Sequence, residues 1–208
     1  GFVRVGLDTD LQALKLNYER GHKNVTLGDS TRLPFKSESF DVILCSEVLE
    51  HLPDGMDEKT LGEMARTLKP GGRLLITVPS LEGVRATSKL RNLGHEDPTG
   101  GEYHYRMGYA WNDIKAMIAR IHSLRTIKRF YSMFLFAELF MDLLKWVFYR
   151  KKSLREQSDL SSVSDSKLFH VYRWFFPVLH SLFLVEDLIL ASIFKGHILI
   201  LELERVDA

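Results

Sequence analysis

The chain of 208 residues has a single cysteine, a net charge of only +1 and no apolar run long enough to cross a bilayer. Because the lone thiol, Cys45, cannot form an internal disulfide, we expect a reducing, cytoplasmic setting. The near-neutral charge removes the general reason to expect a nucleic-acid partner, which usually requires a strongly basic face. The longest uncharged part of the apolar C-terminal region, Trp174 to Val185, is too short to span a membrane alone.

The composition is that of an ordinary globular protein, with 45% hydrophobic and 26% charged residues. A chain of this length forms one domain with a core of its own, so we expect a single domain over 1–208. Its first part, 1–128, alternates strand and helix signals and is the predicted cofactor-binding core. An apolar, aromatic-rich helical insertion or lid follows over 129–196, and 197–206 has the pattern of a last strand.

Short strand patterns recur through the first part, at 2–7, 24–27, 41–45 and 73–78. The third is rich in Val, Ile and Leu, which indicates a strand buried on both faces. Two amphipathic helix patterns lie between them, one capped by Thr9 or Asp10 with Leu11, Leu14 and Tyr18 on one face, and one with Leu61, Met64, Ala65 and Leu68, ended by the turn at 69–72. The alternation predicts a mostly parallel sheet with helices on both faces.

Further elements are predicted beyond residue 110. A helix is marked by Ile114, Met117, Ile118 and Ile121 with Asn112 as its cap, and strands are expected at 124–131 and 197–206. Between these strands lie two mostly apolar helix patterns, 130–149 and 168–194, and the basic run 150–152 follows the first. Ligands of such sheets bind at the carboxyl ends of the strands, where Asp8, Asp29, Cys45 and Pro79 fall.

An acidic residue just past a strand, such as Asp8, can accept hydrogen bonds from two ribose hydroxyls, which suits any adenosine-containing cofactor. The same carboxylate also fits a helix N-cap, and a nicotinamide-dependent oxidoreductase would carry the same acid. Asp8 alone therefore leaves the cofactor open.

Four later segments narrow the choice: 28–35, 39–43, 45–52 and 68–76. Their order and spacing resemble the class I S-adenosylmethionine-dependent methyltransferases of the methyltransferase type 11 kind, and make an oxidoreductase a poorer fit. The resemblance implies a Rossmann-like three-layer α/β/α sandwich with an antiparallel last strand, and S-adenosyl-L-methionine as cofactor. It also implies that Asp29 binds the adenine amine and that the Ser30 amide approaches the ring. The cofactor-binding residues expected from it are Asp8, Thr9, Asp29, Ser30, Cys45 and Ser46.

One part of that family's pattern is absent. The family's first strand and glycine-rich turn should lie upstream of Phe2, and the pairs Gly71-Gly72 and Gly100-Gly101 stand in the wrong places. That strand would be central in the sheet, and its turn would hold the methionine part of the cofactor. Because the chain starts at Gly1, inside a predicted strand, we expect a fragment whose residues alone bind the cofactor weakly or not at all.

The candidate catalytic residues are His51, His104 and Tyr105, which can serve as a general base if the acceptor must lose a proton. If their segment is helical, Glu47, Glu50 and His51 share one face at i, i+3 and i+4. Some quinone-pathway and small-RNA O-methyltransferases hold magnesium with a similar set and a further histidine, for which His95 or His104 would serve. Metal-free relatives use such pairs to cap a helix, and we expect no metal.

The sequence therefore predicts methyl transfer to a small or lipid-like acceptor, with oxygen as the acceptor atom. The alternative is a non-catalytic methyltransferase-like domain that associates through its apolar helices. Those helices can pack together or in a homodimer, cover a hydrophobic acceptor, or contact a membrane surface through 130–152, where an apolar face adjoins a basic cluster.

Overall fold

A computed structural model describes residues 3–83, 105–134, 137, 139, 140, 143, 167–191 and 193–207. The chain divides into two compact units. The first unit is formed by 1–76, 112–128 and 201–208, and the second by 77–111 and 129–200. Each unit is described in turn below.

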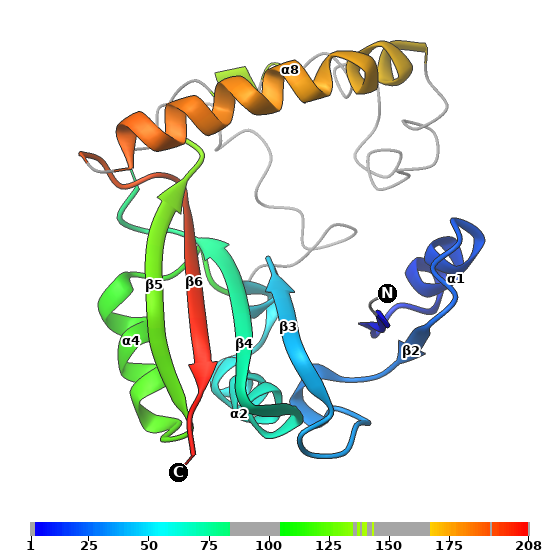
Figure 1. The fold of residues 1–208 in the computed structure, drawn as a ribbon, viewed down its shortest axis with the longest axis vertical. Coiled ribbons are helices and arrows are strands. Elements are labelled where there is room, and N and C mark those ends of the chain that lie inside the picture. The colour runs from blue at the N-terminus through cyan, green and yellow to red at the C-terminus, as the bar shows by residue number, and fades with distance from the viewer. Residues whose placement is uncertain are drawn as a thin grey trace. The chain divides into compact units, whose positions relative to one another are not determined.

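The strands form two separate sheets. In the smaller sheet, β1 (Gly6–Asp8) pairs in parallel with β2 (Val25–Leu27). The larger sheet has the order β3-β4-β6-β5, with β3 at Phe40–Ser46, β4 at Leu68–Pro79, β6 at Ile198–Arg205 and β5 at Leu124–Ser132. Figure 1 shows β6 running opposite to β4 and β5, as expected for an antiparallel last strand. The predicted α/β, Rossmann-like class is confirmed.

The helices begin where capping chemistry allows. In α1 (Leu11–Glu19), the Asp10 carboxylate accepts a hydrogen bond from the Gln12 amide at 2.7 Å, which confirms Asp10 as the cap. The prediction of Asn112 as a cap is wrong, because α4 (Trp111–Arg120) already includes it. The remaining helical elements are η1 (Ser30–Arg32), η2 (Leu49–His51), α2 (Met56–Thr67) and α8 (Lys167–Leu190).

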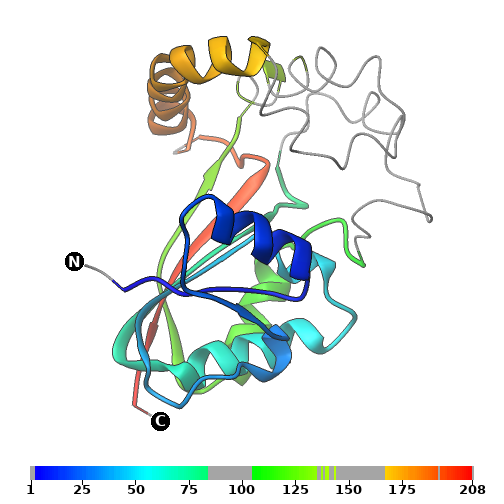
Figure 2. The ribbon, with the colours of Figure 1, turned by 90° about the vertical axis from the view of Figure 1, so that its right-hand side faces the viewer.

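The core of the first unit lies between the larger sheet and two helices. Views along two directions place α2 and α4 on the same face of that sheet (Figures 1 and 2). The predicted stripe of α2 is buried, and so is that of α4, apart from Ile121, which lies beyond the end of the helix. The fully buried side chains that meet them from β4 and β6 are Leu74, Ile76, Leu201 and Leu203.

The opposite face of the sheet is exposed, so the prediction that β3 is buried on both faces is wrong. Val42 is 56% exposed and Leu44 is 68% exposed, whereas Cys45 on the helix-covered side is buried. The predicted apolar face of α1 is also largely exposed, since only Leu14 is buried. A buried strand needs a covering layer on each face, and the described residues provide one layer for β3.

The segment predicted as a turn at 69–72 belongs to β4, which begins directly after α2. Lys69 Nζ lies 2.8 Å from Asp41 Oδ1 and so ties the start of β4 to the start of β3. A side chain at Gly72 would place its Cβ 2.8 Å from the Lys69 carbonyl oxygen, so only glycine fits there.

The membrane contact predicted over 130–152 falls mostly outside the described residues and stays a prediction. Of this range, 130–132 form the end of β5 rather than the start of a helix. None of the helices in the described part of the chain is long and apolar enough to cross a membrane.

Arg66 near the end of α2 organises the turn that leads from η1 into β3. Its guanidinium donates to Glu63 at 2.8 Å, to the Phe35 carbonyl at 2.9 Å and to the Leu33 carbonyl at 3.2 Å. Glu63 in turn accepts from the Leu33 amide at 2.9 Å. The Glu63 carboxylate raises the pKa of Arg66, so this bidentate pair stays charged while it holds the Leu33–Phe35 backbone.

We expect Arg66→Ala to lower the free energy of unfolding by about 1–2 kcal/mol, since several charge-assisted bonds to backbone carbonyls are lost from a partly exposed site. Urea unfolding measures the change. The matched control is Arg120→Ala, which removes an exposed pair with Glu58 that holds no loop backbone and should cost less. Equal losses in the two variants would contradict the assigned role of Arg66.

Candidate functional site

The parallel pairing of β1 with β2 brings two carboxylates to one edge of the smaller sheet. Asp8 is in register with Leu27, and the Gly28 amide donates to the Asp8 carbonyl at 3.0 Å. Asp29 follows directly. A Cβ at Gly28 would lie 2.9 Å from Leu7 Cδ1 and 3.3 Å from the Pro34 ring, so glycine permits this close approach.

Asp8 ends β1 and presents its side chain to solvent. One carboxylate oxygen, Oδ1, accepts from the Asp10 amide at 2.9 Å, which fixes the orientation of the carboxyl group. Thr9 lies between them and is exposed. An oriented, solvent-facing carboxylate at a strand end is suited to accept hydrogen bonds from vicinal hydroxyls of a ligand.

Asp29 and Ser30 are held in place by α2 and η1. Asp29 caps η1 by accepting from the Thr31 amide at 2.7 Å, and this bond lowers the pKa of Asp29, so the carboxyl group is ionised at neutral pH. The Ser30 hydroxyl lies 3.1 Å from the hydroxyl of Thr60, a fully buried residue of α2. The side chain of Ser30 is thus engaged with the protein, as is one oxygen of Asp29.

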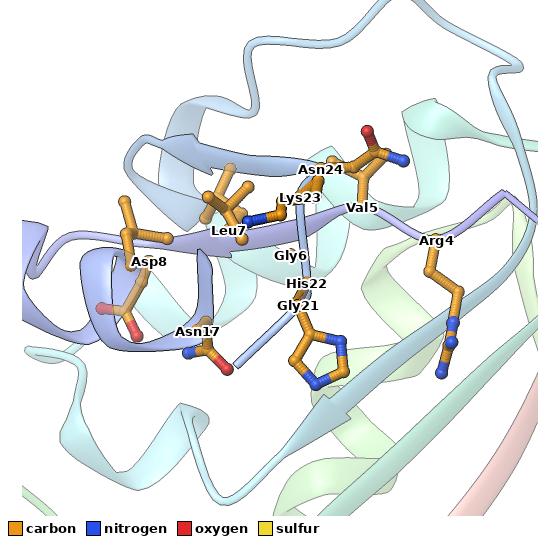
Figure 3. A pocket seen from close by; sticks show the side chains of 12 residues that line it. Arg4, Val5, Gly6, Leu7, Asp8, Asn17, Gly21, His22, Lys23 and Asn24 are labelled. Carbon is orange, nitrogen blue, oxygen red and sulfur yellow. The ribbon is translucent and has the colours of Figure 1, made fainter. Parts of the chain in front are cut away.

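A pocket of about 470 Å³ lies along β1. Figure 3 shows Asp8 at one end and Arg4 at the other, with Asn17 and His22 between them. The volume falls within the range of small-molecule sites. Asp29 and Ser30 do not line it, so the pocket shares only Asp8 with the predicted cofactor residues.

The end of β3 supplies the other predicted cofactor residues and one catalytic candidate. Cys45 is buried, and burial together with the charges of Glu50 and Glu47 raises the pKa of its thiol to about 12. Ser46 is exposed and ends the strand. His51 lies in η2 with its Nε2 atom 4.0 Å from Glu50 Oε1. The Cys45 thiol is therefore buried and neutral, and the His51 ring has the Glu50 carboxylate beside it.

The alternative metal set of Glu47, Glu50 and His51 is not assembled. Glu47 precedes η2 in a left-handed conformation with φ 52°, so the three residues do not share one helix face. Over the described residues, no group of three His, Cys, Asp or Glu side chains is placed to hold an ion. His95 and His104, the proposed further ligands, lie outside the described residues.

Tyr105, the remaining catalytic candidate, belongs to the second unit and is 53% exposed. Sequence reasoning missed a cluster in that unit centred on Glu82. Its carboxylate accepts from Lys195 Nζ at 2.8 Å, Tyr131 Oη at 2.9 Å and the Trp111 amide at 3.2 Å. Lys195 lowers the pKa of Glu82, while burial first and Glu82 second raise the pKa of Tyr131 to about 12.

The Glu82 cluster fastens segments from three parts of the second unit. Glu82 comes shortly after the carboxyl end of β4, which is the one signal in the sequence that marks it. Its partners are distant in sequence, 49 residues away for Tyr131 and 113 for Lys195. The carboxylate accepts three hydrogen bonds from the protein itself, so its role in the described structure is to hold these segments together.

Comparison with known proteins finds a match for part of the first unit. Residues 3–76 match the family model described as "Methyltransferase domain". This segment is therefore similar in sequence to methyltransferase domains. Two demethylmenaquinone methyltransferases are similar to this chain. That of Streptomyces griseus is 41% identical over 36% of this chain and 34% of its own length. That of Renibacterium salmoninarum is 31% identical over 54% of this chain and 52% of its own length. The chain thus matches about a third to a half of the length of these relatives.

Solved structures agree on the fold. A SAM-dependent methyltransferase of Thermotoga maritima superposes with a TM-score of 0.57 at 13% identity, covering 98% of this chain and 73% of that one. Phosphoethanolamine N-methyltransferase 2 of Haemonchus contortus was solved in complex with S-adenosyl-L-methionine. It superposes with a TM-score of 0.52 at 19% identity, covering 98% of this chain and 43% of that one. At these identities the likeness shows that the chain has the methyltransferase fold.

The residues of the matched segment, 3–76, fit the adenosine half of S-adenosyl-L-methionine. Two ionisable carboxylates lie at one edge of the parallel β1–β2 pair, and each uses a single oxygen for a local backbone bond. None of the described residues forms a glycine-rich turn beside them that would hold the methionine half, so the fit covers the adenosine half alone.

We expect Cys45 in the folded protein to react with iodoacetamide at pH 8 at least about a hundredfold more slowly than in urea. A rise of the thiol pKa from 9.0 to about 12 lowers the reactive thiolate fraction about a thousandfold, and burial limits access further. Mass spectrometry follows the single adduct, and Cys45→Ser supplies the blank. Similar rates in the folded and unfolded states would show that Cys45 is not buried.

Proposed function

We propose that the protein transfers a methyl group from S-adenosyl-L-methionine to a small, lipid-like acceptor. The observation that carries the proposal is the pair of carboxylates, Asp8 and Asp29, held at one edge of a parallel strand pair in a segment that matches the methyltransferase domain model. The fold of the chain supports the same reaction class.

Different residues of the first unit are proposed to bind different parts of the methyl donor. Asp8 accepts hydrogen bonds from the ribose hydroxyls, and its bond from Asp10 keeps it aimed. Asp29 accepts from the adenine amine, and the backbone at Ser30 approaches the ring. Thr9, Cys45 and Ser46 form walls of the same site. When bound, the cofactor supplies a methyl group already activated on a sulfonium, so positioning and exclusion of water provide most of the rate.

The acceptor side is proposed from the relatives and from the end of β3. Relatives named demethylmenaquinone methyltransferase support an acceptor with lipid character. Oxygen is the proposed acceptor atom. A hydroxyl must lose its proton during transfer, and His51 is the proposed base because it lies in η2, just past the carboxyl end of β3. His104 and Tyr105 remain the alternatives for this step.

The setting proposed for the protein is the cytoplasm, where its single cysteine stays reduced. A homodimer remains the proposed assembly if the apolar helices pair with a second copy. A non-catalytic, methyltransferase-like binding domain is the alternative function, and the exposed apolar residues of α8 are the observation that favours it.

We expect Asp8→Asn and Asp29→Asn to weaken cofactor binding about fivefold to thirtyfold each, because each removes a charged acceptor worth about 1–2 kcal/mol. Isothermal titration of the protein made from its full coding sequence measures this. Asn at position 29 can still cap η1, so the fold is kept. The control Asp41→Asn removes an exposed carboxylate near the start of β3, away from the carboxyl ends of the strands, and should leave cofactor affinity unchanged.

We expect the 208-residue chain to bind the cofactor weakly or not at all, because its described residues supply the adenosine half of the site. Tight binding of the cofactor by this chain would contradict the inference that the described residues hold its adenosine half alone. Unchanged affinity in both Asp8→Asn and Asp29→Asn would overturn the assignment of the site itself.

We expect His51→Gln to lower kcat about a hundredfold or more with a reduced, prenylated quinone as acceptor, while cofactor affinity stays unchanged. His122→Gln, at an exposed histidine of the first unit, is the matched control. An O-methyl signal in the NMR spectrum of the product supports oxygen, and a C-methyl or N-methyl product contradicts it.

A further inference from the structure

The most exposed face of α8 is also its most apolar face. Trp174 is 76% exposed and Leu188 is 81% exposed, although helices of soluble proteins normally turn such side chains inward. At 100° per residue, one sector roughly 140° wide collects six exposed apolar residues. They are Trp174, Val178, Leu184, Val185, Leu188 and Ile189. We call these six residues the outer sector, and none of their side chains carries a charge.

The opposite stripe of α8 faces the protein and holds the acids. Glu186 accepts from the Ala137 amide at 3.0 Å, and Asp187 accepts from the Ser132 hydroxyl at 2.6 Å. The ring of Phe183 on the same stripe lies 5.6 Å from that of Phe140. The helix is therefore inverted relative to an ordinary surface helix, because its acids lie against the protein and its aliphatic side chains face outward.

The width of the outer sector distinguishes between two kinds of cover. A second helix packs along a narrow seam, about two residues in seven, and would leave much of the sector exposed. The apolar surface also continues past the end of α8 to Ile193 and Phe194, which are 68% and 50% exposed. A lipid phase covers such a surface all at once.

The placement of charges on α8 also favours a lipid surface as the partner of the outer sector. Arg173 flanks the outer sector and is exposed, whereas both acids are fixed on the protein side. A cationic flank without exposed acids is attracted to anionic lipid headgroups. Trp174 near the N-terminal end of the helix is the residue type that prefers the headgroup boundary.

We propose that α8 lies in the surface of a phospholipid bilayer, parallel to it, with its outer sector in the acyl boundary. The helix is an interfacial anchor of the second unit rather than a span. The inference adds a lipid surface to the proposed reaction and stands independently of methyl transfer.

Co-sedimentation with vesicles of phosphatidylcholine and a minority of phosphatidylglycerol tests the anchor. The protein should pellet with the vesicles, and Leu188→Glu should lower its partition at least about tenfold. Leu188 is so exposed that the change spares the fold. Gln12→Glu adds the same charge at an exposed position of α1 and should pellet as the parent does.

Tryptophan emission gives a second measurement. Addition of vesicles should shift the emission to the blue, and Trp174→Phe should abolish most of that shift. Asp8→Asn should still bind vesicles even where it loses cofactor, which separates this proposal from the proposed function.

Failure to pellet, or equal pelleting by Leu188→Glu, would overturn the anchor. A dimer in sedimentation equilibrium that Leu188→Glu converts to a monomer, without vesicle binding by the parent, would assign the outer sector to a second copy instead.

Discussion

The parallel register between β1 and β2 is the constraint on which the site depends. It aligns Asp8 with Leu27, and the next residues of the chain, Gly28 and Asp29, then reach the same edge as Asp8. A shift of one residue would turn one carboxylate to the other face of the pair. Gly28 secures the register because its missing side chain lets Leu7 and Pro34 close around it. Arg66 and Glu63 of α2 then fix the turn that follows.

The two sheets of the chain are separate, and this affects what covers β3. The smaller sheet and the larger one are not paired in the structure, and apolar side chains of β3 are exposed beside solvent. Exposed Val42 and Leu44 together forgo the stabilisation of about 1.5–3 kcal/mol that full burial gives each such side chain. Among the described residues, the first unit has one face of the sheet covered by helices and an opposite face on which side chains of β3 are exposed.

The sequence was informative where chemistry is local. The cap at Asp10, the buried stripe of α2 and the position of Asp29 after β2 follow from spacings of a few residues. Burial of β3 on both faces did not follow, because burial depends on a partner and not on the strand's own composition. The Glu82 cluster joins residues 49 and 113 positions apart, which no local pattern reveals. The apolar pattern of α8 was visible, but its outward orientation depends on where Glu186 and Asp187 find their donors.

We propose that residues 3–76 build the adenosine half of a cofactor site at Asp8 and Asp29. Titration of the isotopically labelled 208-residue chain with adenosine, followed by amide chemical shifts, tests it most directly. We expect the shifts to concentrate at residues 8–10 and 29–31, with none around Glu82. Shifts centred elsewhere, or none at saturating adenosine, would contradict it.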